Sequence, residues 1–445
     1  MKLLFISLGC DKNLVDSEEM LGMLSSRGYE ITDDETQAQV IVINTCCFIH
    51  DAKEESIQTI LEMAEYRKRG SCRALLVTGC LAQRYQEEIR QEIPEVDAVL
   101  GTTGFPEILQ ALESCLEGRP YESYPDVNAL PLVEEERILT TGGHYGFLKI
   151  AEGCEKHCTY CIIPRLRGSY RSVPMERLLK QARSMVSQGV KELILVAQET
   201  TLYGVDLCGK KSLHVLLEKL CEIQGLVWIR VQYCYPEEIY PELIDVMAKE
   251  KKICHYLDLP IQHASDRILR RMGRRTSKEQ LVSLIRTLRE RIPDIVLRTT
   301  LITGFPGETQ EDHEELMEFV NDMEFDRLGV FTYSQEEDTP AAEMPDQIDE
   351  VVKEARQAEL MELQQEISLE KGQARIGQKM LVMIEGKVAD ENAYVGRTYG
   401  DAPKVDGYIF VQTGELLMSG DFVEVRVTGA LEYDLIGEIW DEYTE

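Results

Sequence analysis

Short apolar runs separated by longer stretches of mixed polarity open the chain. Three of these runs are LLFISL at 3–8, VIVIN at 40–44 and ALLV at 74–77. The stretch at 14–28 spaces Leu14, Met20 and Leu24 along one helix face and stops at a glycine. Apolar runs that alternate with such helices predict βαβ units and a parallel sheet. We therefore expect an N-terminal α/β domain over residues 1–135.

The middle of the chain continues the alternation of strand and helix candidates. A first strand candidate, YGFLKIAEGC, covers 145–154. Five more follow at 192–200, 227–236, 254–265, 295–309 and 327–334. The pattern predicts six β/α units in a middle domain of residues 140–370.

The hydrophobic period changes near the C-terminus. Apolar residues first repeat at helical spacing at Ile348, Val351, Val352, Ala355 and Ala358, which predicts an amphipathic helix. From about residue 373 the chain turns to short alternating strands split by glycines: KMLVMIEGKV, AYVGRT, GYIFVQ, DFVEVRVTGAL and DLIGEIW. Five such strands predict a small antiparallel β-barrel over residues 374–445.

Composition identifies a soluble globular protein with more than one domain. The chain has 445 residues, of which 44% are hydrophobic and 29% charged. The start MKLLFISLGC resembles a lipoprotein signal, but its apolar run is too short, and no later stretch is long enough to span a bilayer. We expect a cytoplasmic location, where thiols stay reduced, so the thirteen cysteines are interpreted as metal ligands or small buried hydrophobes. A net charge of −31 opposes purely electrostatic binding of free nucleic acid.

Three cysteines stand just beyond the three N-terminal apolar runs. They are Cys10, Cys46 and Cys80. Residues just past the carboxyl ends of parallel strands converge on one crevice, so we expect these thiols to meet and to bind metal. The alternative is that each is a small buried hydrophobe. Cys47 falls one place past the pattern, so it is expected to point elsewhere and is interpreted as a packing residue.

A second cysteine group lies in the compact stretch EGCEKHCTYC. Cys154, Cys158 and Cys161 have the spacing Cys-x3-Cys-x2-Cys, which lets three thiolates bind three irons of a cubane cluster and leaves the fourth iron open. A zinc site is the alternative, with His157 as its fourth ligand.

A strand leading into this motif, with Tyr160 before its last cysteine, resembles the signature of the radical S-adenosylmethionine (radical SAM) enzymes. The resemblance implies a partial (β/α)6 barrel and a 4Fe-4S cluster whose open iron chelates SAM, which is then cleaved to a 5′-deoxyadenosyl radical. In GFPGET, the residues Gly304, Pro306 and Gly307 resemble the family's glycine-rich turn beside the adenosyl part of SAM. An ordinary turn between strand and helix is the alternative there.

Over essentially its whole length the chain resembles the methylthiotransferases, radical SAM enzymes that place a methylthio group on carbon. This resemblance implies a second 4Fe-4S cluster held by Cys10, Cys46 and Cys80, two molecules of SAM per turnover, and a C-terminal TRAM barrel that binds the macromolecular substrate. It further implies an electron donor such as flavodoxin or ferredoxin, and no membrane partner.

The family has two branches, one acting on a transfer RNA adenosine and one on the β-carbon of an aspartate in the twelfth protein of the small ribosomal subunit. Stretches that resemble the ribosomal branch include SLGCDKNLVDSE, IIPRLRGSYRS, YLDLPIQHAS and GRTYGDAPKVDGYIFV. The alternatives are the transfer RNA enzyme and, in another class, a non-catalytic iron–sulfur electron carrier or scaffold.

The negative charge of the barrel favours a protein over an RNA as the substrate. Residues 374–445 hold six Lys and Arg against fourteen Asp and Glu, a balance that is poorly suited to holding RNA phosphates. A basic ribosomal protein would instead be attracted. We expect Asp401 and Asp406, in GDAPKVDG, to lie at or near the contact with that substrate.

Overall fold

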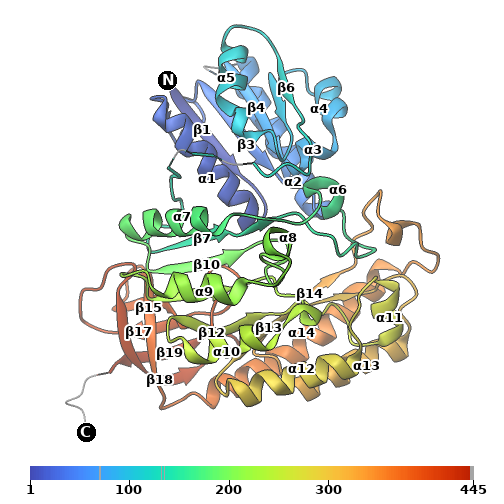
Figure 1. Ribbon diagram of the computed structural model, residues 1–445, viewed down its shortest axis with the longest axis vertical. Helices are drawn as coiled ribbons and strands as arrows, with labels where there is room; N and C mark the ends of the chain where they lie inside the picture. The colour runs from blue at the N-terminus through green and yellow to red at the C-terminus, as the bar shows by residue number, and fades with distance from the viewer. Residues whose placement is uncertain (70–71, 132, 135, 441–445) are drawn as a thin grey trace.

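The computed structural model describes residues 1–69, 72–131, 133–134 and 136–440. Figure 1 shows an N-terminal domain at the top, a middle domain below it and a C-terminal barrel at the lower left. The predicted fold class is confirmed: two parallel sheets with helices, followed by a closed barrel. No helix among the described residues is long and apolar enough to cross a membrane.

The N-terminal domain is a six-stranded parallel sheet with helices on both faces. Ile41 and Ile43 of β3 pack towards Ile60 on one face, and Val40 and Val42 pack towards α1 and α5 on the other. Burial on both faces explains why the strand runs are continuously apolar. The strands, in the order β2-β1-β3-β4-β5-β6, are β1 (Lys2–Ser7), β2 (Glu30–Ile31), β3 (Val40–Thr45), β4 (Ala74–Gly79), β5 (Ala98–Leu100) and β6 (Tyr121–Ser123). The helices are α1 (Asp11–Ser26), α2 (His50–Arg69), α3 (Cys80–Arg84), α4 (Gln86–Glu92) and α5 (Ile108–Leu116), with the 3-10 turn η1 (Phe105–Glu107).

The middle domain contains the six predicted parallel strands. Their order, β14-β13-β12-β11-β10-β7, puts the first and last strands at opposite edges, as in an incomplete barrel. The strands are β7 (Tyr145–Lys149), β10 (Glu192–Val196), β11 (Trp228–Val231), β12 (Ile253–Asp258), β13 (Val296–Thr303) and β14 (Arg327–Thr332). The helices are α6 (Ile163–Arg167), α7 (Met175–Ser187), α8 (Val205–Cys208), α9 (Leu213–Cys221), α10 (Pro241–Lys249), α11 (Asp266–Arg271), α12 (Lys278–Arg291), α13 (Gln310–Met323) and α14 (Glu350–Gln373). A two-stranded antiparallel sheet, β8 (Ala151–Glu152) with β9 (Arg171–Ser172), and the 3-10 turns η2 (Pro236–Glu238) and η3 (Pro340–Glu343) complete it.

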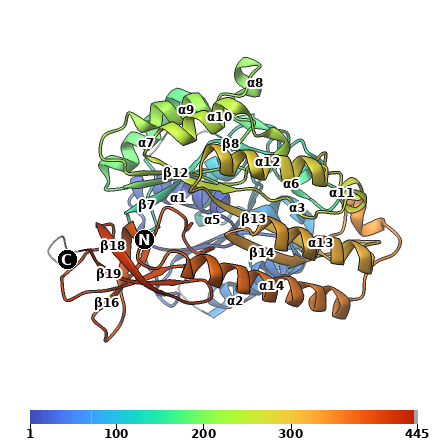
Figure 2. The same cartoon turned by 90° about the horizontal axis from the view of Figure 1, so that it is seen from below.

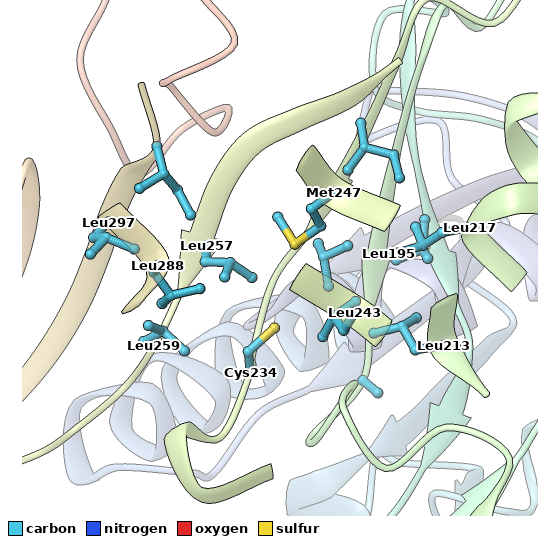
Figure 3. Close-up of a cluster of buried hydrophobic side chains, with 14 of the residues drawn as sticks. Leu195, Leu213, Leu217, Cys234, Leu243, Met247, Leu257, Leu259, Leu288 and Leu297 are labelled. Carbon is cyan, nitrogen blue, oxygen red and sulfur yellow. The ribbon is translucent and has the colours of Figure 1, made fainter. Parts of the chain in front are cut away.

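The largest core cluster lies between this sheet and its helices. Figure 3 shows Leu195, Leu257 and Leu297 of the strands meeting leucines of α9, α10 and α12. The opposite face of the sheet packs against the rest of the molecule, where Val15 of α1 and Met383 of the barrel join one cluster with the strand residues. Both neighbouring domains therefore contact the sheet through that face.

Helix α14 confirms the predicted helix but not its predicted buried face. Val351 and Val352 are 72% and 40% exposed, while Lys353 and Arg356 are buried. Lys353 donates to the carbonyl of Tyr333, and the guanidinium of Arg356 lies 2.8 Å from a carboxylate oxygen of Glu308. Long basic side chains bury their aliphatic stems when their charged ends find such partners, and an apolar pattern does not reveal this.

The C-terminal barrel has the five predicted strands, closed in the order β15-β16-β17-β19-β18. One neighbouring pair, β17 with β19, is parallel, and the other four are antiparallel. The strands are β15 (Lys379–Lys387), β16 (Ala393–Arg397), β17 (Ile409–Gln412), β18 (Phe422–Ala430) and β19 (Leu435–Ile439). Figure 2 shows the barrel beside the start of β7 and the end of α14.

Candidate active site

The three N-terminal cysteines meet where their strands end. Cys10 precedes α1, Cys46 follows β3 and Cys80 opens α3. Gly9, at φ +86°, lets the neighbouring loop approach: a Cβ there would come within 2.8 Å of the Cys46 sulfur. Burial, with the thiols of Cys80 and Cys10 nearby, raises the pKa of Cys46 to about 12. The loops thus bring the thiols of Cys80 and Cys10 within electrostatic reach of Cys46.

Cys47 is more deeply buried than Cys10 and Cys46. It is fully buried in the apolar cluster that holds Ile43, Ile60 and also Cys80. Burial raises its pKa above the usual range, and its carbonyl accepts a hydrogen bond from Arg84 at 3.4 Å. These surroundings are those of a packing residue.

The second trio lies in the loop between β8 and α6. Burial raises the pKa of Cys154 to about 11, with Glu199 and Cys158 as further causes, and burial and then Cys158 raise the pKa of Cys161. The backbone N–H of Cys161 donates to the carbonyl of Cys158 at 3.0 Å, so these two sit on one tight turn. His157 is exposed, at φ 52°.

Each trio offers three thiols, a donor set that suits a cubane cluster with one iron left open. In this structure no group of three or more His, Cys, Asp or Glu side chains among the described residues is placed to hold a metal ion.

Glu199 is a residue of this site that sequence reasoning missed. It lies just past the carboxyl end of β10 and is fully buried. One carboxylate oxygen accepts the backbone N–H of Thr201 at 2.8 Å, while the other has no hydrogen-bond partner and lies 4.0 Å from the Lys156 ammonium. Burial raises the pKa of Glu199 to about 7. A buried carboxylate beside Cys154, with one oxygen free of hydrogen bonds, is suited to binding a ligand's ammonium group. The only signal in the sequence is an acidic residue three positions past the end of an apolar strand.

The turn formed by Gly304, Pro306 and Gly307 connects β13 to α13. Both glycines have positive φ, and a Cβ at Gly304 would come within 2.2 Å of the Lys353 side chain. Arg271 of α11 donates to the carbonyl of Pro306 at 3.1 Å, and its own carbonyl accepts from Thr159 at 2.8 Å. The turn is therefore linked to the cysteine loop through α11, and packing alone already requires glycine at position 304.

The N-terminal trio faces the middle domain. The Lys12 ammonium lies 3.3 Å from the centre of the Tyr233 ring, and the Tyr233 hydroxyl donates to Asp11 at 3.1 Å. Tyr233 follows β11, so residues next to Cys10 contact the carboxyl edge of the middle sheet. Both trios thus lie towards the same interface between domains.

The expectation for Asp401 and Asp406 is wrong. Asp401 is 2% exposed and paired with Arg327, and the side chain of Asp406 is 1% exposed and lies 3.3 Å from Arg298. The Tyr256 hydroxyl also donates to Asp406 at 2.8 Å. These carboxylates join the barrel to the middle domain and are not available to a substrate, because basic partners from the same chain already neutralise them.

Three family models match the chain in succession: "Uncharacterized protein family UPF0004" over residues 2–101, "Radical SAM superfamily" over 148–320 and "TRAM domain" over 376–439. Among solved structures, the radical S-adenosylmethionine methyltransferase TsrM from Kitasatospora setae, with cobalamin and a [4Fe-4S] cluster bound, superposes with a TM-score of 0.55 at 14% identity. The match covers 76% of each chain and supports the fold.

Relatives named "Ribosomal protein uS12 methylthiotransferase RimO" match at much higher identity. The protein of Lachnoclostridium phytofermentans is 67% identical over 98% of this chain and 99% of its own length. Those of Pelotomaculum thermopropionicum and Clostridioides difficile are 52% and 48% identical, over 98% and 99% of this chain and 99% of their own lengths. With both cysteine trios at one interface and relatives this similar over the full length, the chain belongs to the RimO family of ribosomal protein uS12 methylthiotransferases.

Proposed function

We propose that this protein places a methylthio group on the β-carbon of an aspartate in uS12, the twelfth protein of the small ribosomal subunit. The observation that supports this most is 67% identity over 98% of the chain to a relative named for that activity. We place the reaction in the cytoplasm, with electrons from a donor such as flavodoxin or ferredoxin.

We assign one part of the reaction to each of three successive regions of the chain. We assign residues 1–135 to the sulfur-carrying domain, 140–370 to the radical SAM core and 374–445 to the TRAM domain. Cys154, Cys158 and Cys161 would hold one 4Fe-4S cluster, and Cys10, Cys46 and Cys80 a second. When bound, the first cluster supplies the electron that cleaves SAM, and the second supplies a position for sulfur.

The chain's own residues prepare this site. Glu199 would offer the carboxylate oxygen that has no hydrogen-bond partner to the ammonium of SAM, and Gly304, Pro306 and Gly307 would border the adenosyl part. Lys12 contacts the ring of Tyr233 and so joins the two domains beside Cys10, which is itself exposed. Two molecules of SAM would be used per product, one for the methyl group and one for hydrogen abstraction.

Reconstitution under anaerobic conditions tests the proposal. The protein should hold about eight irons, form 5′-deoxyadenosine from SAM when reduced, and add a methylthio group to uS12, detected by mass spectrometry. Replacing Cys154, Cys158 and Cys161 together by Ala should remove half of the iron and abolish 5′-deoxyadenosine. A protein that binds iron but never cleaves SAM would instead be an electron carrier or scaffold.

A further inference from the structure

One buried guanidinium links the two cysteine trios. Arg167 is the last residue of α6, the short helix that begins two residues after Cys161, and it is 2% exposed. It donates to the side-chain oxygen of Asn13 at 3.0 Å, in the first turn of α1. Arg167 belongs to the middle domain and Asn13 to the N-terminal domain, so this bond crosses the interface.

Asn13 also forms hydrogen bonds to the backbone beside two of the three N-terminal cysteines. Its side-chain NH2 donates to the carbonyls of Leu8 at 2.7 Å and Thr45 at 3.3 Å. Leu8 stands two residues before Cys10, and Thr45 stands immediately before Cys46. Asn13 is 1% exposed, so water does not replace these bonds.

The third cysteine loop is held by the same group of contacts. The hydroxyl of Thr45 donates to the carbonyl of Thr78 at 2.6 Å, two residues before Cys80. Leu166 of α6 packs into the same apolar cluster as Cys80, and its carbonyl accepts from Thr102 at 2.7 Å. Figure 1 shows α6 lying against the N-terminal domain although it belongs to the middle of the chain.

Arg167 is itself fixed by buried carboxylates. Its guanidinium lies 2.7 Å from Asp16 and 3.3 Å from Glu152, and Lys149 pairs with the same two acids. An arginine fork held by two anions has few other orientations, so its bond to Asn13 has a defined direction.

We propose that Arg167 and Asn13, which we call the linking pair, fix the position of the N-terminal cysteine trio relative to the middle-domain trio. They are positioning residues: neither would touch substrate or SAM. The role rests on the proposed function, in which sulfur held at one trio must reach a carbon activated at the other. Misplacement by an ångström would leave SAM cleavage intact while sulfur transfer failed.

Three variants separate this role from general stability. Asn13→Ala removes the hydrogen bond from Arg167 and the bonds that hold the carbonyls of Leu8 and Thr45 beside the cysteines. Arg167 stays paired with Asp16, on the same helix α1, and with Glu152, so no buried charge loses its partner and the domains remain joined. Arg167→Lys keeps the charge without the planar fork. Its ratio of methylthio product to 5′-deoxyadenosine should lie between those of wild type and Asn13→Ala. Arg165→Gln is the matched control, because Arg165 lies on the same helix with its side chain 64% exposed.

The reconstituted full-length enzyme is given SAM, reductant and uS12. For Asn13→Ala we expect iron content and 5′-deoxyadenosine within twofold of wild type, while methylthio product per 5′-deoxyadenosine falls at least fivefold. In a background lacking Cys154, Cys158 and Cys161, Asn13→Ala should also change the EPR signal of the remaining cluster. Arg165→Gln should change neither measurement.

Two results would overturn the linking pair: an unchanged product ratio and EPR signal in Asn13→Ala, or equal loss of iron from both sites together with a lower melting temperature. Failure of the proposed function looks different. Wild type would then form 5′-deoxyadenosine without modifying uS12, and the EPR comparison would still test the linking pair.

Discussion

Two adjacent cysteines, Cys46 and Cys47, differ in their surroundings. The thiols of Cys80 and Cys10 both lie near Cys46, whereas Cys47 is fully buried in the apolar cluster that also holds Cys80. We expect Cys46→Ala to lose about four irons per chain while SAM cleavage continues. Cys47→Ala should keep all the iron and lose about 1 kcal/mol of stability through the small cavity. Iron analysis of both variants decides the assignment, and the reverse pattern would exchange their roles.

Glu19 makes stability depend on pH. It is 8% exposed, and burial raises its pKa from 4.5 to about 7. The folded state therefore binds this proton more tightly than the unfolded state, so its contribution is complete below pH 4.5 and is lost as pH rises through 7. Glu19→Gln removes this dependence. The stability of the variant relative to wild type should grow by up to about 3 kcal/mol between pH 4.5 and 8.

Urea unfolding of the metal-free protein at several pH values measures this difference. Glu113→Gln on α5 is the control, because Glu113 is exposed and its replacement should give no such trend. A stability difference that stays constant with pH would contradict the role of Glu19.

Among single residues, the spacing in the sequence identifies the cysteines. It does not identify residues whose role depends on contacts between distant parts of the chain. Cys154, Cys158 and Cys161 are recognisable because seven or fewer positions separate them. Arg167 and Asn13 stand 154 positions apart, so no local pattern reveals that they meet. Asp401 and Asp406 were misassigned for the same reason: a charge count does not show which carboxylates already have basic partners inside the fold.

Among the elements, strands with both faces buried were the easiest to predict. β3 and β4 are fully buried along their length and match their apolar runs, whereas two- and three-residue strands such as β2 and β5 carry too few residues for a period. All five barrel strands were predicted, but the parallel pairing of β17 with β19 was not. Pairing depends on closure of the whole barrel, which the local pattern does not contain.

The barrel is attached to the middle sheet through Glu192. This carboxylate is fully buried, 2.8 Å from Arg230 of β11 and 2.7 Å from Arg397 of β16. Glu192→Gln would leave two buried cations without their shared anion, so we expect a loss of about 3 kcal/mol and faster proteolysis between α14 and β15. Glu424→Gln, which breaks the exposed pair with Lys379, should cost less than about 1 kcal/mol. Equal losses in both variants would show that Glu192 does not secure the barrel.

At the scale of the whole molecule, the structure lowers the negative charge that the barrel exposes to solvent below the value counted from the sequence. Asp401 and the side chain of Asp406 are buried against the middle domain, so the excess that faces solvent is smaller than the sequence count suggests. Asp390, Glu391 and Glu415 remain exposed. The carbonyl of Asn392 accepts the backbone N–H of Thr413, which places the loops that carry these acids side by side. We call these three residues the acidic patch.

We predict that the acidic patch attracts uS12, a protein that binds ribosomal RNA and is expected to be basic. Opposite charges mainly accelerate association and lose strength as salt screens them. Reversing all three residues to Lys should slow association with uS12 about tenfold at low salt, and the deficit should shrink near 0.5 M salt.

Glu432→Lys, at a separate exposed acid of the barrel, is the control for net charge. Stopped-flow association measures the rates, and modification of transfer RNA is assayed beside them. If the reversed patch bound uS12 normally, recognition would lie elsewhere, and methylthio-adenosine in transfer RNA with unmodified uS12 would assign this enzyme to the other branch of the family.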